Sequence, residues 1–175
     1  MIAVQKIGGG VSGAVRYALS EGREMTTAPD GRQIPAGYKP CPANDDESRV
    51  TWISGQGFPE WQPETRADAD LARKVMEFAA APQNQTSKTR LVEKDCLHLM
   101  LAWRTGETPN REEMESAAKQ ALRVLGMGKA RALFVAHNDK DHAHIHIIAS
   151  RINTETGEAF SDSFSHTKLQ EWCLK

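Results

Sequence analysis

The sequence lacks the features that mark several large classes of protein. Its three cysteines, Cys41, Cys96 and Cys173, are odd in number, far apart and without a CxxC pair. They predict neither a disulfide framework nor a cysteine-based zinc site, and they fit reduced thiols in a cytoplasm. No apolar run approaches the roughly 20 residues that cross a bilayer, and the N-terminus carries no secretion signal. We therefore expect no membrane insertion.

The chain also lacks an excess of positive charge. Its 22 Lys and Arg residues are offset by 23 Asp and Glu residues, which leaves a formal net charge of -1. A site for a polyanion must then be local, built from clustered basic side chains. The candidates for such a cluster are Arg16, Lys88, Arg90, Lys94, Arg104, Lys140 and Arg151.

Length and composition indicate one globular domain. The chain has 175 residues, of which 39% are hydrophobic and 26% charged, and this is enough to bury a core. Because the sequence stops inside a predicted helix, we expect residues 1–175 to be a single domain at the N-terminal end of a longer protein.

Hydrophobic periodicity predicts strands and helices in a mixed order. Strands are expected at 1–7, 49–55, 96–103, 131–136 and 142–151, and helices at 11–19, 63–81, 110–125 and 165–174. The last two strands are joined by about five residues, which is too short for a parallel crossover. The pattern predicts an α+β fold, a two-layer sandwich with a mainly antiparallel central sheet, helices on one face and the active site on the other.

Three helices have predicted apolar stripes. These are Val11, Val15, Ala18 and Leu19; then Ala67, Leu71, Val75 and Phe78; then Met114, Ala117, Ala118, Ala121, Leu122 and Leu125. Asn110 is the expected N-cap of the third helix, and Gly126 and Gly128 its stop. Residues 22–48 have no steady period and predict a long irregular stretch.

Four of the six histidines fall within residues 137–146. Side chains of a strand alternate, so His142, His144 and His146 are expected on one face, with apolar neighbours on the other. His137 would approach from across the hairpin. Clustered histidines at strand spacing are typical of a metal site. We predict that His137, His144 and His146 bind one ion.

The remaining polar residues of this stretch have expected supporting roles. His142 lies nearer the loop, where it could contact the metal ligands or a substrate. Asp139 and Asp141 could orient an imidazole through its second nitrogen. His98 has no such neighbours in sequence and is expected to be a half-buried residue on the sheet face.

Three nitrogen ligands leave open positions on an ion, which is typical of a catalytic site. Such an ion can neutralise a phosphate oxygen and orient an attack on phosphorus. The nucleophile could be metal-bound water or a tyrosine that forms a covalent intermediate. The chain has two tyrosines, Tyr17 and Tyr38, and their spacing does not choose between them.

The pattern from His137 to His146, followed by Ser150-Arg151-Ile152-Asn153, resembles the three-histidine motif of conjugative relaxases. These are single-strand DNA endonucleases of the HUH type, and the chain is most similar to their MOBP class. Residues 15–21 resemble the first motif of that family, which carries the nucleophilic tyrosine. Residues 98–107 resemble the strand and turn in the middle of the relaxase domain.

The resemblance implies that Tyr17 attacks a phosphodiester at the nic site of a plasmid or integrative-element origin of transfer, leaving a 5′-phosphotyrosyl link and a free 3′-hydroxyl. It implies the same triad, His137, His144 and His146, as ligands of a divalent ion, which we expect to be Mg²⁺ or Mn²⁺. Asp139 or His142 would assist proton removal from Tyr17.

The resemblance also implies partners and a location. The partners would be single-stranded origin DNA, accessory relaxosome proteins and a coupling protein. The location would be a bacterial cytoplasm, with translocation alongside transferred DNA. Three alternatives remain open from the residues themselves: a rolling-circle replication initiator nuclease, a hydrolase that uses metal-bound water, and a non-catalytic metal-binding or DNA-binding module.

Overall fold

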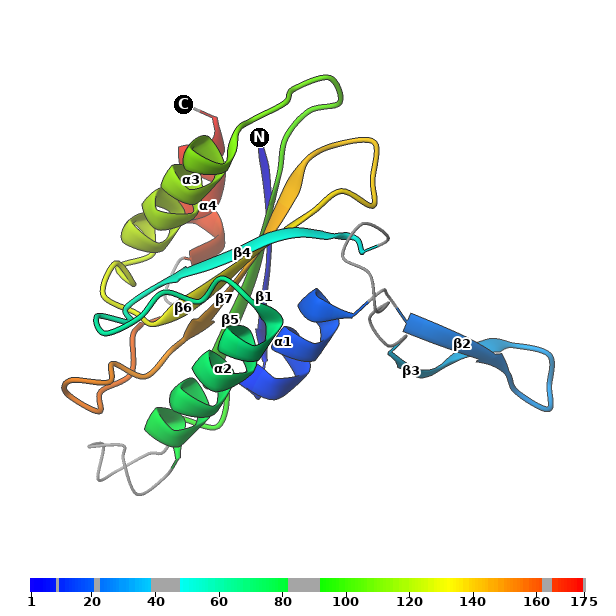
Figure 1. Cartoon of the computed structure of the whole chain (residues 1–175), viewed down its shortest axis with the longest axis horizontal. Coiled ribbons are helices and arrows are strands. Elements are labelled where there is room, and N and C mark those ends of the chain that lie inside the picture. The colour runs from blue at the N-terminus through cyan, green and yellow to red at the C-terminus, as the bar shows by residue number, and fades with distance from the viewer. Residues whose placement is uncertain (9, 21–22, 39–47, 82–91, 162–164, 175) are drawn as a thin grey trace.

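The computed structural model describes residues 1–8, 10–20, 23–38, 48–81, 92–161 and 165–174. Five strands form the main sheet in the order β1-β5-β7-β6-β4, and every neighbouring pair is antiparallel (Figure 1). These strands are β1 (Ile2–Gly8), β4 (Val50–Gln56), β5 (Cys96–Ala102), β6 (Ala132–His137) and β7 (His144–Ser150). The helices are α1 (Val11–Leu19), α2 (Arg66–Ala80), α3 (Arg111–Val124) and α4 (Ser165–Cys173). The α+β class and the antiparallel sheet are confirmed.

The expected placement of helices on one face of the sheet is wrong. The core cluster on one face contains α3 and α4 residues, and the cluster on the other face contains α1 and α2 residues. Figure 1 shows the two helix pairs on opposite sides of the strands. The physical reason lies in β6 and β7, which are buried along their whole length. Central strands with apolar residues on both faces need a cover on each side.

Alternation along β7 assigns its side chains to the two covers. Ile145 and Ile147 pack in the cluster under α3, whereas Ile148 packs in the cluster with α1 and α2. His144 and His146 alternate with Ile145 and Ile147, so the histidines share the α1 and α2 face. The site therefore lies beside helices and not on a bare face of the sheet.

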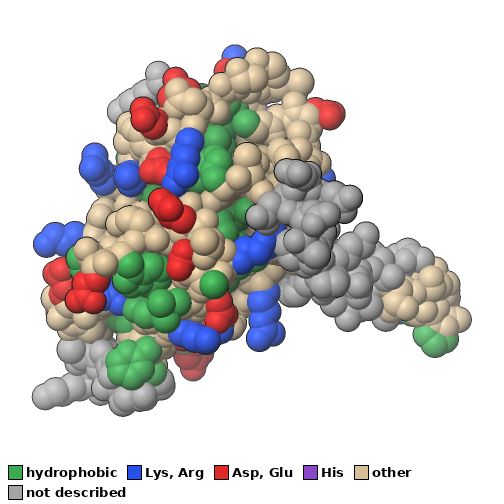
Figure 2. Space-filling view, in the orientation of Figure 1, with side chains coloured by type: hydrophobic (Ala, Val, Ile, Leu, Met, Phe, Trp, Pro, Cys, Tyr) green, Lys and Arg blue, Asp and Glu red, His purple; other side chains and the backbone are tan. Residues whose placement is uncertain are grey.

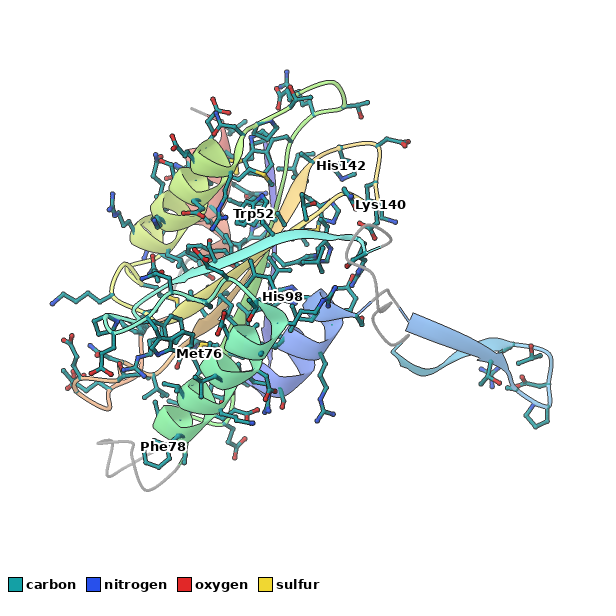
Figure 3. The ribbon with its side chains drawn as sticks, viewed as in Figure 1. Trp52, Met76, Phe78, His98, Lys140 and His142 are labelled. Atoms are coloured by element: carbon teal, nitrogen blue, oxygen red, sulfur yellow. The ribbon has the colours of Figure 1, made fainter. Side chains whose placement is uncertain are left out.

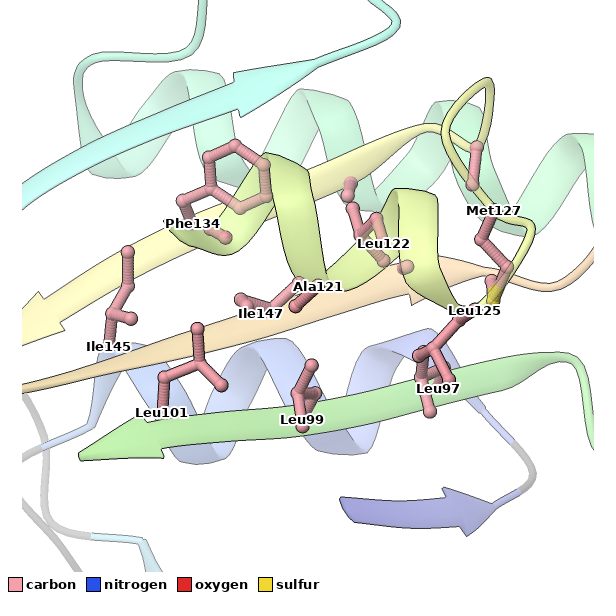
Figure 4. Packing of buried hydrophobic residues seen from close by; sticks show 14 of the residues in the cluster. Leu97, Leu99, Leu101, Ala121, Leu122, Leu125, Met127, Phe134, Ile145 and Ile147 are labelled. Carbon is pink, nitrogen blue, oxygen red and sulfur yellow. The ribbon is translucent and has the colours of Figure 1, made fainter. Parts of the chain in front are cut away.

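The cover formed by α3 follows the expected stripe. Figure 4 shows Ala121, Leu122 and Leu125 over the leucines of β5 and the isoleucines of β7. Asn110 caps the helix as expected, because its side chain accepts a hydrogen bond from the Glu113 N–H while the Glu113 carboxylate accepts one from the Asn110 N–H. At the other end Gly126 has φ +75°, a backbone conformation that glycine adopts without strain.

The expected stripe of α2 is wrong. The buried residues are Ala69, Ala72, Met76 and Ala80. Leu71 and Phe78, which were expected to face the core, are 49% and 71% exposed. α2 packs closely on α1, and small side chains allow this approach where leucine and phenylalanine would separate the helices. Phe78 points outward in Figure 3.

Residues 22–48 contain a second sheet that the sequence did not predict. β2 (Arg23–Thr27) and β3 (Gln33–Tyr38) pair in an antiparallel hairpin. Figure 1 shows this hairpin standing away from the main sheet. β3 contains Pro35 and Gly37, which are uncommon inside strands and hide the pattern. Tyr38 ends β3, so its backbone belongs to this separate sheet.

Two further expectations, about membrane-crossing helices and about reduced cysteines, are compared with the described residues. Within the described ranges no helix has both the length and the apolar character that crossing a bilayer requires. Cys96 and Cys173 are free thiols, and Cys41 lies outside the described residues. Burial raises the pKa of the Cys96 thiol to about 12, so it stays protonated at neutral pH.

Candidate metal centre and nucleophile

The histidine cluster is built by two adjacent strands. His137 ends β6 and lies directly opposite His144 at the start of β7, and His146 follows two residues later on the same face. All three residues are buried, and one ring nitrogen from each lies within 4.8 Å of the others. The antiparallel register therefore assembles the three predicted ligands.

Each of these imidazoles has a partner at its outer nitrogen. Nε2 of His137 lies 2.7 Å from the Ala18 carbonyl oxygen, and Nδ1 of His144 lies 3.3 Å from the His142 carbonyl oxygen. Nδ1 of His146 lies 2.9 Å from Nε2 of His98. Ligating histidines usually make such a second hydrogen bond, which fixes the tautomer and the ring orientation.

The second ring nitrogen of each histidine, here called the inner nitrogen, faces the middle of the cluster. Nδ1 of His137 is fully buried and has no hydrogen-bond partner among the described residues. A buried lone pair without a partner is costly. Three neutral ring nitrogens, one of them without a partner, fit a divalent transition-metal ion or a similar cation.

Burial keeps the cluster uncharged. It lowers the pKa of His137 to about 4, with the Arg49 guanidinium acting in the same direction. It lowers the pKa of His146 to about 2, with His137 and His98 adding to the effect. The pKa of His144 is also lowered, mainly by burial. At neutral pH the imidazoles are therefore in the form that binds metal.

Asp139 lies on the inner side of the cluster. Its Oδ1 is 3.3 Å from Nε2 of His144 and 4.0 Å from Nδ1 of His137. Burial, the largest single influence, raises the pKa of this carboxyl, but the charge and hydrogen bond of Arg49 together with His137 and His144 outweigh burial, and the pKa is lowered. The outer nitrogens that Asp139 was expected to orient are held instead by carbonyls and by His98. Asp139 is an anion that faces the same space as the inner nitrogens.

Tyr17 projects from α1 toward this cluster. Its ring centroid is 5.6 Å from that of His146, with the rings at 89°, and 5.8 Å from that of His98. The Arg49 guanidinium lies 5.3 Å from the Tyr17 ring centroid, within the range of a cation–π contact. The structure thus brings together two motifs that are about 120 residues apart.

The C-terminal carbonyls of α1 anchor this helix to the site. Such carbonyls have no partner within a helix and attract cations. Here they accept hydrogen bonds from Arg49, Arg66 and His137. The acceptors are the carbonyls of Tyr17, Ala18, Leu19 and Ser20. Nη1 of Arg49 also lies 3.3 Å from Oδ2 of Asp139, so one arginine connects the tyrosine helix with the histidine cluster.

Other predicted site residues lie further out. His142 precedes β7, near the hairpin loop (Figure 3), and its carbonyl holds His144 while its ring centroid is 5.7 Å from that of His144. Asp141 is exposed. Figure 2 shows basic and acidic side chains interspersed on the face in view. Arg151 is buried and donates to the Lys94 and Phe160 carbonyls, whereas Lys88 and Arg90 lie outside the described residues.

Sequence reasoning missed three residues of the site. His98 was expected only to be a half-buried residue of the sheet face, and the structure adds its contact with His146. This contact depends on the pairing of β5 with β7, which cannot be predicted from the sequence alone. Arg49 and Arg66 act through backbone carbonyls, and no sequence motif marks such contacts.

Comparison with known proteins decides the family. Residues 60–175 match the nuclease domain of MobA/VirD2-like relaxases. The chain belongs to this relaxase family. The match includes the whole histidine stretch and begins after Tyr17 and Arg49.

Three curated relatives match parts of the relaxase domain. Protein MobA of Acidithiobacillus ferrooxidans is 36% identical over 59 residues, 34% of this chain and 14% of that protein. Two TraI proteins of Escherichia coli are 28% identical over 89 residues and 25% identical over 109 residues, which cover 51% and 62% of this chain. The matches span 12% and 15% of those two proteins. No solved structure matches the chain significantly.

Proposed function

We propose that this relaxase domain nicks one DNA strand at an origin of transfer and transfers that strand through a covalent tyrosyl intermediate. The observation that carries the proposal is the position of the Tyr17 ring, edge-on to a ring of the buried histidine triad. Family membership supports a nuclease, and the triad supports a metal-assisted reaction at phosphorus.

In the proposed reaction the Tyr17 oxygen attacks the scissile phosphorus after losing its proton. A bond forms between this oxygen and phosphorus, the bond from phosphorus to the 3′ oxygen breaks, and the 3′ oxygen takes up a proton. One phosphodiester bond is exchanged for another, so the free energy of the bond is retained. A second 3′-hydroxyl can therefore reverse the step. A divalent ion, when bound by His137, His144 and His146, would offset the charge of the phosphate oxygens.

The residues around Tyr17 have proposed supporting roles. Arg49 fixes the end of α1 through two carbonyls and places a cation beside the phenol ring, where it would favour the phenolate. Asp139 and His142 remain the candidates that assist the departure of the phenolic proton. Asp139 is connected to the tyrosine helix through its ion pair with Arg49.

The proposal extends to the partners. Single-stranded origin DNA is the proposed substrate, and accessory relaxosome proteins and a coupling protein are the proposed companions of the whole protein. Mg²⁺ or Mn²⁺ is the proposed ion, since both suit oxygen ligands such as the Asp139 carboxylate, which faces the inner nitrogens, and the phosphate oxygens of DNA.

The proposal is tested with labelled oligonucleotides that tile the origin of transfer of the element carrying the gene. With Mn²⁺ or Mg²⁺, a 3′-labelled strand should shift to a denaturant-resistant protein adduct. A 5′-labelled strand should be released with an end that a polymerase extends. Tyr17→Phe should abolish the adduct, and Tyr38→Phe, the matched control, should keep it.

The outcomes separate the alternatives. An adduct that persists in Tyr17→Phe would refute the proposed nucleophile. Turnover without an adduct and insensitive to both tyrosine variants would indicate attack by metal-bound water. Metal and DNA binding without any cleavage would indicate a non-catalytic module, and cleavage confined to a replication origin would indicate a rolling-circle initiator.

A further inference from the structure

His98 lies against the metal triad from the strand next to it. β5 pairs with β7 so that Met100 stands opposite His146, and His98 is the next residue of β5 on the same face. This diagonal position brings Nε2 of His98 to 2.9 Å from Nδ1 of His146. Figure 3 shows His98 between the sheet and α1. The same ring meets Tyr17, with centroids 5.8 Å apart.

A hydrogen bond between two neutral imidazoles has a direction. One nitrogen must carry the proton and the other must accept it. If His98 donated, Nδ1 of His146 would be the acceptor and its Nε2 would carry the hydrogen. That tautomer has no lone pair directed at the triad, so it cannot bind an ion.

The neighbouring His137 indicates which direction holds. The outer nitrogens of His137 and His144 face the carbonyl oxygens of Ala18 and His142. A carbonyl can only accept, so His137 donates outward and keeps its inner lone pair. His144 has an acceptor at each ring nitrogen, the His142 carbonyl at Nδ1 and the Asp139 carboxylate at Nε2, both at 3.3 Å. His146 has a histidine in the place where its neighbours have a carbonyl. For His146 to present its Nε2 lone pair to an ion, His98 must accept a hydrogen bond from Nδ1–H of His146, as a carbonyl would.

We propose that His98 is a positioning residue for the metal centre: its Nε2 accepts a hydrogen bond from Nδ1–H of His146 and so directs the Nε2 lone pair of His146 at the ion. This inference rests on the proposed metal-assisted function of the triad. It assigns His98 an action through His146, with no contact of its own to the ion. It also gives a reason for a histidine at this point of β5, because a carbonyl of a paired strand points along the sheet and cannot reach His146.

The direct test is the tautomer of His146 in the metal-free wild-type protein, read from two-bond ¹H–¹⁵N correlations of uniformly labelled protein near pH 7. The expected pattern is a protonated Nδ1 and an unprotonated Nε2 for His146, with an unprotonated Nε2 for His98. A protonated Nε2 on His146 would overturn the inference. This measurement requires no variant and no activity.

Variants of His98 test the consequence for binding. His98→Phe keeps a ring beside Tyr17 but removes the acceptor, and His98→Gln restores an acceptor oxygen. Loss of a partner of a metal-ligating histidine typically weakens affinity about 10- to 100-fold. Titration calorimetry with Mn²⁺ should therefore give this loss for His98→Phe, with most of the affinity recovered in His98→Gln. The exposed His166 provides a control, His166→Phe, with an unchanged Kd.

The results are independent of those that test strand transfer. Wild-type Mn²⁺ affinity in a folded His98→Phe protein, checked by circular dichroism, would overturn the role of His98 even if DNA adducts still form. A protein with the expected His146 tautomer and the expected rank of Mn²⁺ affinities, but without adducts, would refute the proposed nicking and support the role of His98.

Discussion

The buried histidine triad should make the metal-free protein sensitive to mild acid. An imidazole in the unfolded chain has a pKa of about 6.5. In the folded protein burial lowers the pKa of His137 to about 4 and that of His146 to about 2. Between these values the unfolded chain binds protons that the folded chain does not bind. The free energy of unfolding therefore falls as the pH falls below about 6.5 and is unaffected by these groups above it.

The size of the effect follows from the two shifts. On going from pH 7.5 to pH 5, each of the two histidines should remove about 2 kcal/mol, because each pH unit below 6.5 costs about 1.4 kcal/mol per proton. The sum of about 4 kcal/mol is a large part of the about 5–15 kcal/mol that stabilises a typical domain. Carboxylates with lowered pKa values, such as Asp139, stay ionised in this window and contribute little.

The measurement is urea unfolding of chelator-treated protein at pH 5.0, 5.5, 6.5 and 7.5. Near pH 5 the slope should correspond to the uptake of at least two protons on unfolding, since the lowered pKa of His144 adds to those of His137 and His146. His146→Gln should remove about one of them, whatever its effect on stability at pH 7.5. His166→Gln, at an exposed position, should leave the slope unchanged. A change below about 1 kcal/mol over this range, or an equal slope in His146→Gln, would refute the reasoning.

Three further predictions concern the anchor, the ion and the fold. Arg49→Lys keeps the charge but loses the two-pronged guanidinium that binds the end of α1. Adduct formation should therefore slow by about 10- to 100-fold in a gel time course. An unchanged rate would contradict the anchoring role of Arg49. Mn²⁺ at about 100 times its Kd should raise the free energy of unfolding by about 2.7 kcal/mol, measured by urea titration, and His144→Ala should remove this gain. Gly55→Ala would place a Cβ 2.7 Å from the Ala132 carbonyl oxygen and should cost about 1–3 kcal/mol in the same assay; Gly13→Ala, with nothing within 4 Å, should not.

The order of elements could be predicted because its signals are local. The stripe of α3, its Asn110 cap and its glycine stop all depend on neighbours within a few residues. The stripe of α2 failed for the opposite reason. Leucine and phenylalanine are the more apolar residues, but the close packing of α1 and α2 selects alanines for the interface.

The histidine stretch by itself determined much of the candidate site. Alternation along a strand put His144 and His146 on one face, and a short hairpin loop brought His137 opposite them. These relations follow from the geometry of one hairpin. They require no knowledge of the rest of the chain.

Only the tertiary structure decided what surrounds the triad. The contact of His98 with His146 depends on the pairing of β5 with β7, and the contacts of Arg49 are made to backbone carbonyls and to Asp139. Backbone acceptors are present at every residue and leave no mark in the sequence. The position of Tyr17 beside the histidines also depends on the packing of α1 against the sheet. Short-range periodicity therefore identifies the candidate ligands, and long-range packing decides which residues hold and orient them.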